Sequence, residues 1–166
     1  MTIENKNLQD NYILNMLSKI KHKKWELYII TRIIHLLNDD EIEFVCQQHV
    51  KTRDNKRFLM DLCFPQLKLY CEIDEGQHKL QQHSINDEIR KEEIIDATDF
   101  VEKRIKIYKE NDDELKYKKL VKINCEINEF VKFVKKKKKE LINNKTFEPW
   151  IFSKKYYPST YVNKGY

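Results

Sequence analysis

The sequence predicts an α/β fold in which a central mixed sheet is flanked by helices and a further long helix follows near the C-terminus. Three observations predict it. Apolar residues recur at intervals of three and four in three long segments, which is typical of amphipathic helices. Four shorter segments alternate or are continuously apolar, as strands are. With only 2 Gly and 3 Pro in 166 residues, and 36% charged residues, the composition favours long helices over a loop-rich fold.

The first helical segment runs from about residue 10 to residue 38, because its apolar residues keep helical spacing throughout. A break near His22, inside a basic stretch, would divide the segment into two helices. Residues 43–50 then predict the first strand. The polar residues 51–56 after it include Asp and Asn, which favour a turn, so a hairpin loop is expected there.

The centre of the sequence is a predicted hairpin formed by two apolar segments on either side of Pro65 and Gln66. Asp61 lies in the first segment, and Glu72 and Asp74 lie in the second. Side chains alternate between the two faces of a strand, so Glu72 and Asp74 share one face. A loop of two or of four residues brings Asp61 to the same face, and a four-residue loop puts it directly opposite Glu72.

Carboxylates gathered on one face of a hairpin predict a metal site. Like charges opposed across a hairpin destabilise it, and buried carboxylates without partners are costly or have a raised pKa. A bound divalent cation removes that cost, and carboxylate oxygens suit Mg2+, with Mn2+ as a substitute. The alternative is a structural Asp at a strand end and an ordinary turn at residues 73–76; a loop of odd length would also separate the carboxylates.

The remaining segments complete the order helix, strand, strand, strand, helix, strand. Residues 85–100 predict a helix, and the alternation at residues 104–108 predicts the fourth strand. A long helix is expected over residues 115–141, and it contains five consecutive lysines that begin with Lys135 and Lys136. Such a run is usually a solvated helix end, and its second interpretation is contact with DNA phosphates.

Asp61, the short turn after it and the run Glu72-Ile73-Asp74-Glu75-Gly76-Gln77-His78 resemble the core of the PD-(D/E)XK nuclease superfamily. The resemblance is to the branch related to the very-short-patch-repair endonuclease and the DUF559 domains, where an Asp strand precedes Glu-x-Asp and a His. It covers about residues 24–108 and implies a restriction-endonuclease-like αβββαβ core, the same order as the hydrophobic patterns indicate. Asp74 stands where many members of the superfamily have a catalytic Lys, which leaves the general base open.

The resemblance implies a metal-dependent endonuclease that hydrolyses phosphodiester bonds in DNA. Asp61 and Glu72 would hold Mg2+ together with the backbone carbonyl of Ile73. Asp74 or His78 would position or deprotonate the attacking water, and an imidazole suits this role because its pKa lies near physiological pH. For His78 alone, the structural alternative is a histidine in a surface loop.

Four further positions match the resemblance. Related nucleases often carry a Glu like Glu26 on the first core helix; the alternative is a solvent-facing Glu paired with a Lys. Gln48 matches a Gln that such domains aim at the active site. Asp87 and Arg90 match an Asp-x-x-Arg, in which Arg90 would contact phosphate or lock the helix through an ion pair. Lys79 would add to DNA binding.

The composition sets bounds on the partners. The net charge of +5 is compatible with a polyanion such as DNA without requiring one. The 4 Cys form no CxxC pair and three lie in predicted strands, which indicates buried thiols in a reducing compartment rather than a zinc site. No apolar signal segment or membrane-length run occurs, so a cytoplasmic protein without membrane contact is expected. No organic cofactor is expected.

The length predicts one nuclease-like domain over residues 1–145. The aromatic-rich residues 146–166 either pack on it or link it to a module absent from this chain, as in the nuclease half of a restriction or repair enzyme. One active site would cut both strands only through a homodimer or repeated nicking. The alternative function is a non-catalytic nucleic-acid-binding or protein-interaction module on the same fold, and a third is an RNA-directed nuclease.

Overall fold

The computed structural model of the chain describes residues 3–75, 81–108 and 117–150. Its elements are α1 (Ile3–Ile20), α2 (Lys24–Leu37), β1 (Val45–Lys51), β2 (Arg57–Phe64), the short 3-10 helix η1 (Pro65–Leu67), β3 (Leu69–Asp74), α3 (Gln81–Thr98), β4 (Val101–Lys106) and α4 (Leu120–Asn143). The predicted order of helices and strands and the long C-terminal helix are confirmed.

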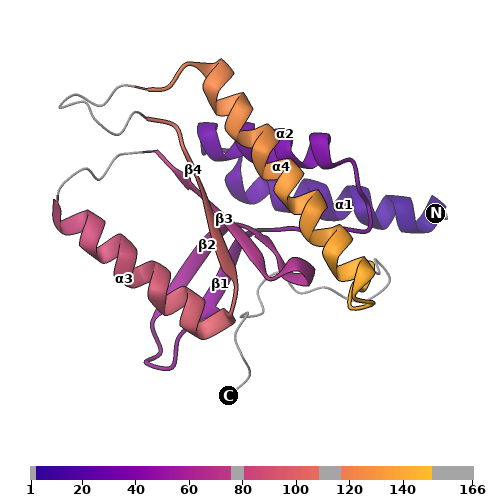
Figure 1. The fold of residues 1–166 in the computed structure, drawn as a ribbon. Helices are drawn as coiled ribbons and strands as arrows, with labels where there is room; N and C mark the ends of the chain where they lie inside the picture. The colour runs from indigo at the N-terminus through magenta and orange to yellow at the C-terminus, as the bar shows by residue number, and fades with distance from the viewer. Residues whose placement is uncertain (1–2, 76–80, 109–116, 151–166) are drawn as a thin grey trace.

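The four strands form one mixed sheet in the order β1-β2-β3-β4. β1, β2 and β3 are antiparallel neighbours, and β4 runs parallel to β3 because α3 carries the chain back between them. Figure 1 shows α3 on one side of the sheet and α1, α2 and α4 gathered on the other. The core lies between the sheet and this group of three helices, where Phe64 of β2 meets Phe130 of α4 with ring centroids 6.1 Å apart.

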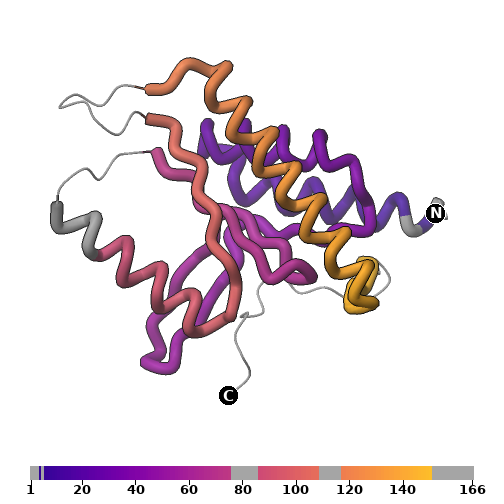
Figure 2. Tube along the Cα trace, in the orientation of Figure 1, coloured from indigo at the N-terminus to yellow at the C-terminus, as the bar shows by residue number. Residues whose placement is uncertain are grey.

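The first helical segment is divided, as predicted, at residues 21–23. The tube in Figure 2 shows α1 and α2 as two helices joined by this short connection. α1 begins at Ile3 rather than near residue 10. The early residues of the sequence are mostly polar, so they carry no apolar periodicity from which a helix start could be predicted.

The connection between β2 and β3 has four residues, which is the longer of the two even lengths that the sequence allows. Pro65 begins η1, and Lys68 closes it in the left-handed region with φ 47°. The strands pair in a register that sets Leu62 opposite Cys71 and Cys63 opposite Tyr70. Continuing this register by one residue places Asp61 directly opposite Glu72, as the four-residue loop predicts.

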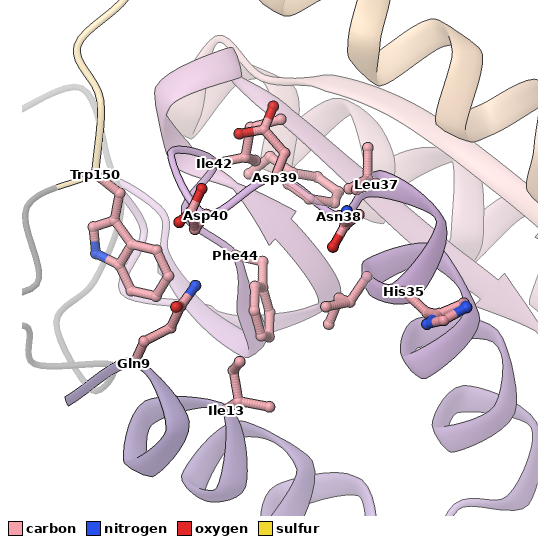
Figure 3. A pocket seen from close by; sticks show the side chains of 12 residues that line it. Gln9, Ile13, His35, Leu37, Asn38, Asp39, Asp40, Ile42, Phe44 and Trp150 are labelled. Atoms are coloured by element: carbon pink, nitrogen blue, oxygen red, sulfur yellow. The ribbon is translucent and has the colours of Figure 1, made fainter. Parts of the chain in front are cut away.

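The described part of the aromatic-rich tail packs on the domain. The backbone N–H of Trp150 donates to the carbonyl of Glu41 at 2.9 Å, and the indole ring lies 4.7 Å from the ring of Tyr12. The side-chain amide of Gln66 donates to the carbonyl of Glu148 at 2.5 Å. Trp150 also lines a cavity of about 500 Å³ with Phe44 and residues of α1 and α2 (Figure 3).

Three of the cysteines are buried in strands, as the sequence predicts. Cys46, Cys63 and Cys71 are buried in β1, β2 and β3, whereas Cys125 on α4 is exposed, and all four are free thiols. Among the described residues, no helix combines the length and the hydropathy that crossing a membrane requires.

Candidate active site

A cavity of about 640 Å³ collects most of the polar residues that the sequence singles out. Its acidic lining residues are Glu26, Asp61, Glu72, Asp74, Glu75 and Asp87. Its basic lining residues are His22, Lys23, Lys24, Arg90 and Arg104. These side chains come from the turn before α2, from α2 itself, and from β2, β3, α3 and β4. The fold therefore brings Glu26, 35 positions before Asp61 in the sequence, to the carboxylates of the central hairpin.

Asp61 and Glu72 both line this cavity. The Asp61 carboxylate accepts a hydrogen bond from the backbone N–H of Ile73, with 2.9 Å between Oδ2 and N. Glu72 is only 6% exposed. Burial, with the nearby charge of Asp61, raises the pKa of Glu72 to about 8, although Arg90 opposes the shift. A carboxylate that is so costly to ionise is a favourable place for a cation.

Glu26 is joined to Asp61 by the side chain of Gln47. The Gln47 amide donates to Oε2 of Glu26 at 2.8 Å and to Oδ1 of Asp61 at 3.1 Å. The other oxygen of Glu26 accepts a hydrogen bond from Lys23 at 2.6 Å. Burial, and then the charge of Asp61, raises the pKa of Glu26. Glu26 is thus buried in the site and does not face solvent, although it does have a lysine partner.

The prediction that Gln48 is aimed at the active site is wrong, because the neighbouring Gln47 occupies that place. Gln48 is fully buried, and its amide donates to the carbonyl of His49 at 3.0 Å. In β1 the register continues through Gln47 opposite Asp61. Gln47 has φ 53°, a left-handed conformation that is costly for a residue other than glycine and is often found at functional sites.

Arg90 contacts residues of β2 and β3. Its guanidinium lies 3.3 Å from Oε1 of Glu72 and donates to the carbonyl of Leu59 at 2.5 Å. The structure shows Arg90 in an ion pair and not free for phosphate contact. Its partner is Glu72 of β3 and not Asp87, which lies one helical turn away on α3. Asp87 lies 3.9 Å from Arg104. No local signal in the sequence indicates a pair between α3 and β3.

Asp74 shares the cavity but is held by its own partners. The hydroxyl of Tyr108 donates to Oδ2 of Asp74 at 2.8 Å, and Arg104 lies 3.6 Å from the same oxygen. Arg104 also pairs with Glu102 at 3.2 Å. These contacts hold the Asp74 carboxylate between β3 and β4.

Four predicted residues remain. His78 and Lys79 fall outside the described residues. Lys135 donates to the carbonyl of Leu36 at 3.1 Å, and Lys136 is an exposed residue 3.9 Å from Glu140. Neither lysine lines the cavity. Their contact with DNA stays a prediction.

A magnesium ion fits part of this site. In the described ranges, no three His, Cys, Asp or Glu side chains are grouped so that they could hold a metal by themselves. Mg2+, however, is usually bound through one or two carboxylates and keeps several waters. Asp61 and Glu72, with the main-chain carbonyl of Ile73, form such an oxygen donor set, and each Asp61 oxygen that accepts a hydrogen bond retains a second lone pair.

The fold and the site define a nuclease domain of the restriction-endonuclease type. The family model described as restriction endonuclease PvuRts1 I-like, N-terminal, matches residues 10–154. The chain therefore belongs to the PvuRts1 I-like N-terminal family of restriction endonucleases.

One solved structure and the curated proteins complete the comparison. The structure titled the 5-hydroxymethylcytosine-specific restriction enzyme AbaSI is 29% identical, with a TM-score of 0.65. The match covers 86% of this chain and 51% of that one, so the chain spans about half the length of this relative. No curated protein matches. Membership in the very-short-patch-repair and DUF559 branch is not confirmed.

Proposed function

We propose that this domain is a divalent-metal-dependent DNA endonuclease and forms the cleavage half of a restriction enzyme. The observation that carries the proposal is the direct opposition of Asp61 and Glu72 across β2 and β3, with Glu72 buried at the cavity. Two carboxylates opposed in this way are unfavourable until a cation binds between them. Family membership adds DNA as the polymer that is cut. We also propose that the domain is a member of the PD-(D/E)XK superfamily and of its very-short-patch-repair and DUF559 branch.

Asp61, Glu72 and the carbonyl of Ile73 would hold Mg2+, which supplies a Lewis acid for the phosphate and lowers the pKa of a bound water. Hydrolysis forms a bond from the water oxygen to phosphorus and breaks one ester P–O bond, while the water proton passes to a base. The base stays open between His78 and Asp74, as in the sequence analysis. Glu26 is a further group whose raised pKa suits proton transfer, and Gln47 holds it beside Asp61.

The substrate is proposed to be DNA that carries modified cytosine. The relative of known structure is named as specific for 5-hydroxymethylcytosine, and the present chain matches about half of it. The described residues of the chain form the nuclease fold alone. Recognition of the modified base would then reside in a further part of the whole enzyme, and this domain would supply the cleavage.

The test is cleavage of supercoiled plasmid in two forms, one with ordinary cytosine and one with 5-hydroxymethylcytosine. Each form is incubated with the protein and Mg2+ or Mn2+, with EDTA, and with the Asp61→Ala variant. Asp54→Asn is the matched control, because Asp54 is an exposed acidic residue in the turn between β1 and β2. We expect metal-dependent nicking or linearisation that Asp61→Ala abolishes and Asp54→Asn retains. Cleavage by Asp61→Ala, or cleavage in EDTA, would overturn the proposal.

A further inference from the structure

The candidate active site is rich in carboxylates, whose negative charge opposes the binding of DNA. Six acidic and four permanently cationic side chains line the cavity, together with His22. A phosphodiester is itself an anion, so the carboxylates of the cavity repel it. A bound metal offsets part of this repulsion, and a cation that is free to turn toward the phosphate would offset more.

The two arginines of the cavity are committed to other partners. Arg90 pairs with Glu72 and with the carbonyl of Leu59. Arg104 pairs with Glu102 and Asp74. Each guanidinium would therefore have to leave two partners in order to bind a phosphate.

Lys23 has fewer partners than either arginine. Its ion pair with Glu26 joins residues three apart, and its side chain is 34% exposed. Among the described residues its ammonium has one hydrogen-bond partner, Glu26, whereas Arg90 also donates to the carbonyl of Leu59, so Lys23 has less to give up when it turns toward a phosphate. Glu26 does not depend on Lys23 alone, because Gln47 donates to its second oxygen.

The backbone of Lys23 is nevertheless fixed. Its N–H donates to the carbonyl of Ile20 at 2.9 Å, and its carbonyl accepts the N–H of Leu27 at 2.8 Å. The side chain therefore starts from a rigid point between α1 and α2. The adjacent Lys24 is oriented differently, since its ammonium lies 5.5 Å from the centre of the Trp25 ring.

We propose that Lys23 leaves Glu26 when DNA binds and contacts a non-bridging oxygen of the scissile phosphate. There its ammonium neutralises the negative charge that grows on the phosphate in the transition state. The inference rests on the proposed nuclease function and adds a residue that binds the phosphate of that site. Lys23 lines the same cavity as Asp61, and the side chains of Glu26 and Gln47 connect the two residues through hydrogen bonds.

The experiment measures cleavage of the hydroxymethylated plasmid by the full chain at saturating DNA and saturating Mg2+. Lys23→Met keeps the apolar stem of the side chain and removes its charge, whereas Lys23→Arg keeps the charge. Lys21→Met is the matched control, because Lys21 is an exposed lysine of the same turn that does not line the cavity. We expect Lys23→Met to lower kcat by roughly 10²- to 10³-fold, as the loss of one transition-state contact does. Lys23→Arg should stay within about tenfold of the wild type, and Lys21→Met should be unchanged.

Repeating Lys23→Met in the Glu26→Gln background distinguishes phosphate binding by Lys23 from a merely structural role as the counter-charge of Glu26. We expect the same fold-loss in both backgrounds and an unchanged Mg2+ midpoint, whereas the melting temperature should fall only where Glu26 keeps its charge, because Lys23→Met removes the cation of that buried carboxylate. The inference is overturned if Lys23→Met cleaves within about threefold of the wild type, or if its effect disappears once Glu26 is neutral. A wild-type protein that does not cleave with either metal would instead overturn the proposed function, and the inference with it.

Discussion

Asp61 and Glu72 are the next residues after the Leu62–Cys71 pair of β2 and β3, so the register sets them opposite each other, and both carboxylates line the same cavity. The backbone N–H of Ile73 donates to Asp61, so the two strands are tied together at the point where the acidic pair occurs. Glu72 is nearly inaccessible, whereas Asp61 is partly buried. Burial and mutual repulsion therefore make it unfavourable to ionise both carboxylates, and binding of a divalent cation would offset this cost.

Metal binding is expected to stabilise the folded protein. Mg2+ or Mn2+ binds the paired carboxylates of the native state, which the unfolded chain does not hold together, so the melting temperature should rise with metal concentration. At 100 times the dissociation constant the gain is about 2.7 kcal/mol. Glu72→Gln should abolish the rise, and Asp54→Asn should preserve it. An equal rise in Glu72→Gln and the wild type would place the metal elsewhere.

The stability of the metal-free protein is expected to fall as the pH rises from about 4.5 to about 8. The pKa of Glu72 is near 8 in the folded protein and ordinarily 4.5, so between these values the folded chain binds the extra proton. The free energy of unfolding then decreases with pH, by at most about 1.4 kcal/mol per pH unit for one group. Saturating Mg2+ should reverse the trend, because the metal binds the ionised carboxylate.

Chemical denaturation in EDTA from pH 5 to pH 8 checks this pH dependence. Glu72→Gln should show a shallower slope than the wild type. Glu26 contributes in the same direction, since its pKa is also raised by burial, so Glu26→Gln should remove a further part. A wild-type stability that rises over this range in EDTA would contradict the assignment of a protonated Glu72.

Gln47 and Gln48 are expected to respond differently to substitution. Gln47→Leu removes the amide that joins Glu26 to Asp61, and a lost contact of this kind around a metal site typically costs about 10- to 100-fold in activity or metal affinity. Gln48→Leu changes a fully buried side chain away from the cavity, so its effect should be on stability. Plasmid cleavage and thermal unfolding of both variants separate the two. Equal losses of cleavage at equal stability would contradict the distinction.

The acidic pair could be predicted from the sequence because it depends on two local rules. Side chains alternate along a strand, and the length of a hairpin loop decides which residues face one another. The same rules place Gln47 opposite Asp61, but only once the loop between β1 and β2 is known to hold five residues, from Thr52 to Lys56. The positive φ of Gln47 has no signal in the sequence.

The contacts that could not be predicted join elements far apart in the chain. The pair of Arg90 with Glu72 depends on how α3 is set against the sheet, and its helical spacing from Asp87 indicated a different partner. The position of Lys23 in the cavity likewise depends on the angle between α1 and α2. Periodicity defines which face of a helix is buried, but it does not define what that face contacts.

Above about pH 8, where Glu72 is ionised, Arg90→Ala is expected to destabilise the metal-free protein by about 3 kcal/mol, because it leaves this buried carboxylate without its cation. Saturating Mg2+ should recover much of this loss, since the metal supplies the missing positive charge. Thermal unfolding with and without Mg2+ measures the difference. If Arg90 serves only to contact DNA, the variant should instead unfold like the wild type in both conditions and lose DNA affinity alone.

Residues 146–150 are expected to be part of the folded domain. Trp150 packs on Tyr12, its N–H donates to Glu41, and Gln66 donates to the carbonyl of Glu148. A chain that ends at residue 145 loses all of these contacts, whereas one that ends at residue 150 keeps them. Full burial of a large apolar side chain contributes about 1.5–3 kcal/mol, and Trp150 is half-buried, so the shorter chain should lose part of this amount and unfold at a lower urea concentration. Trp150→Ala in the longer chain should reproduce most of the loss, and identical unfolding of the two truncated chains would place the domain boundary at residue 145.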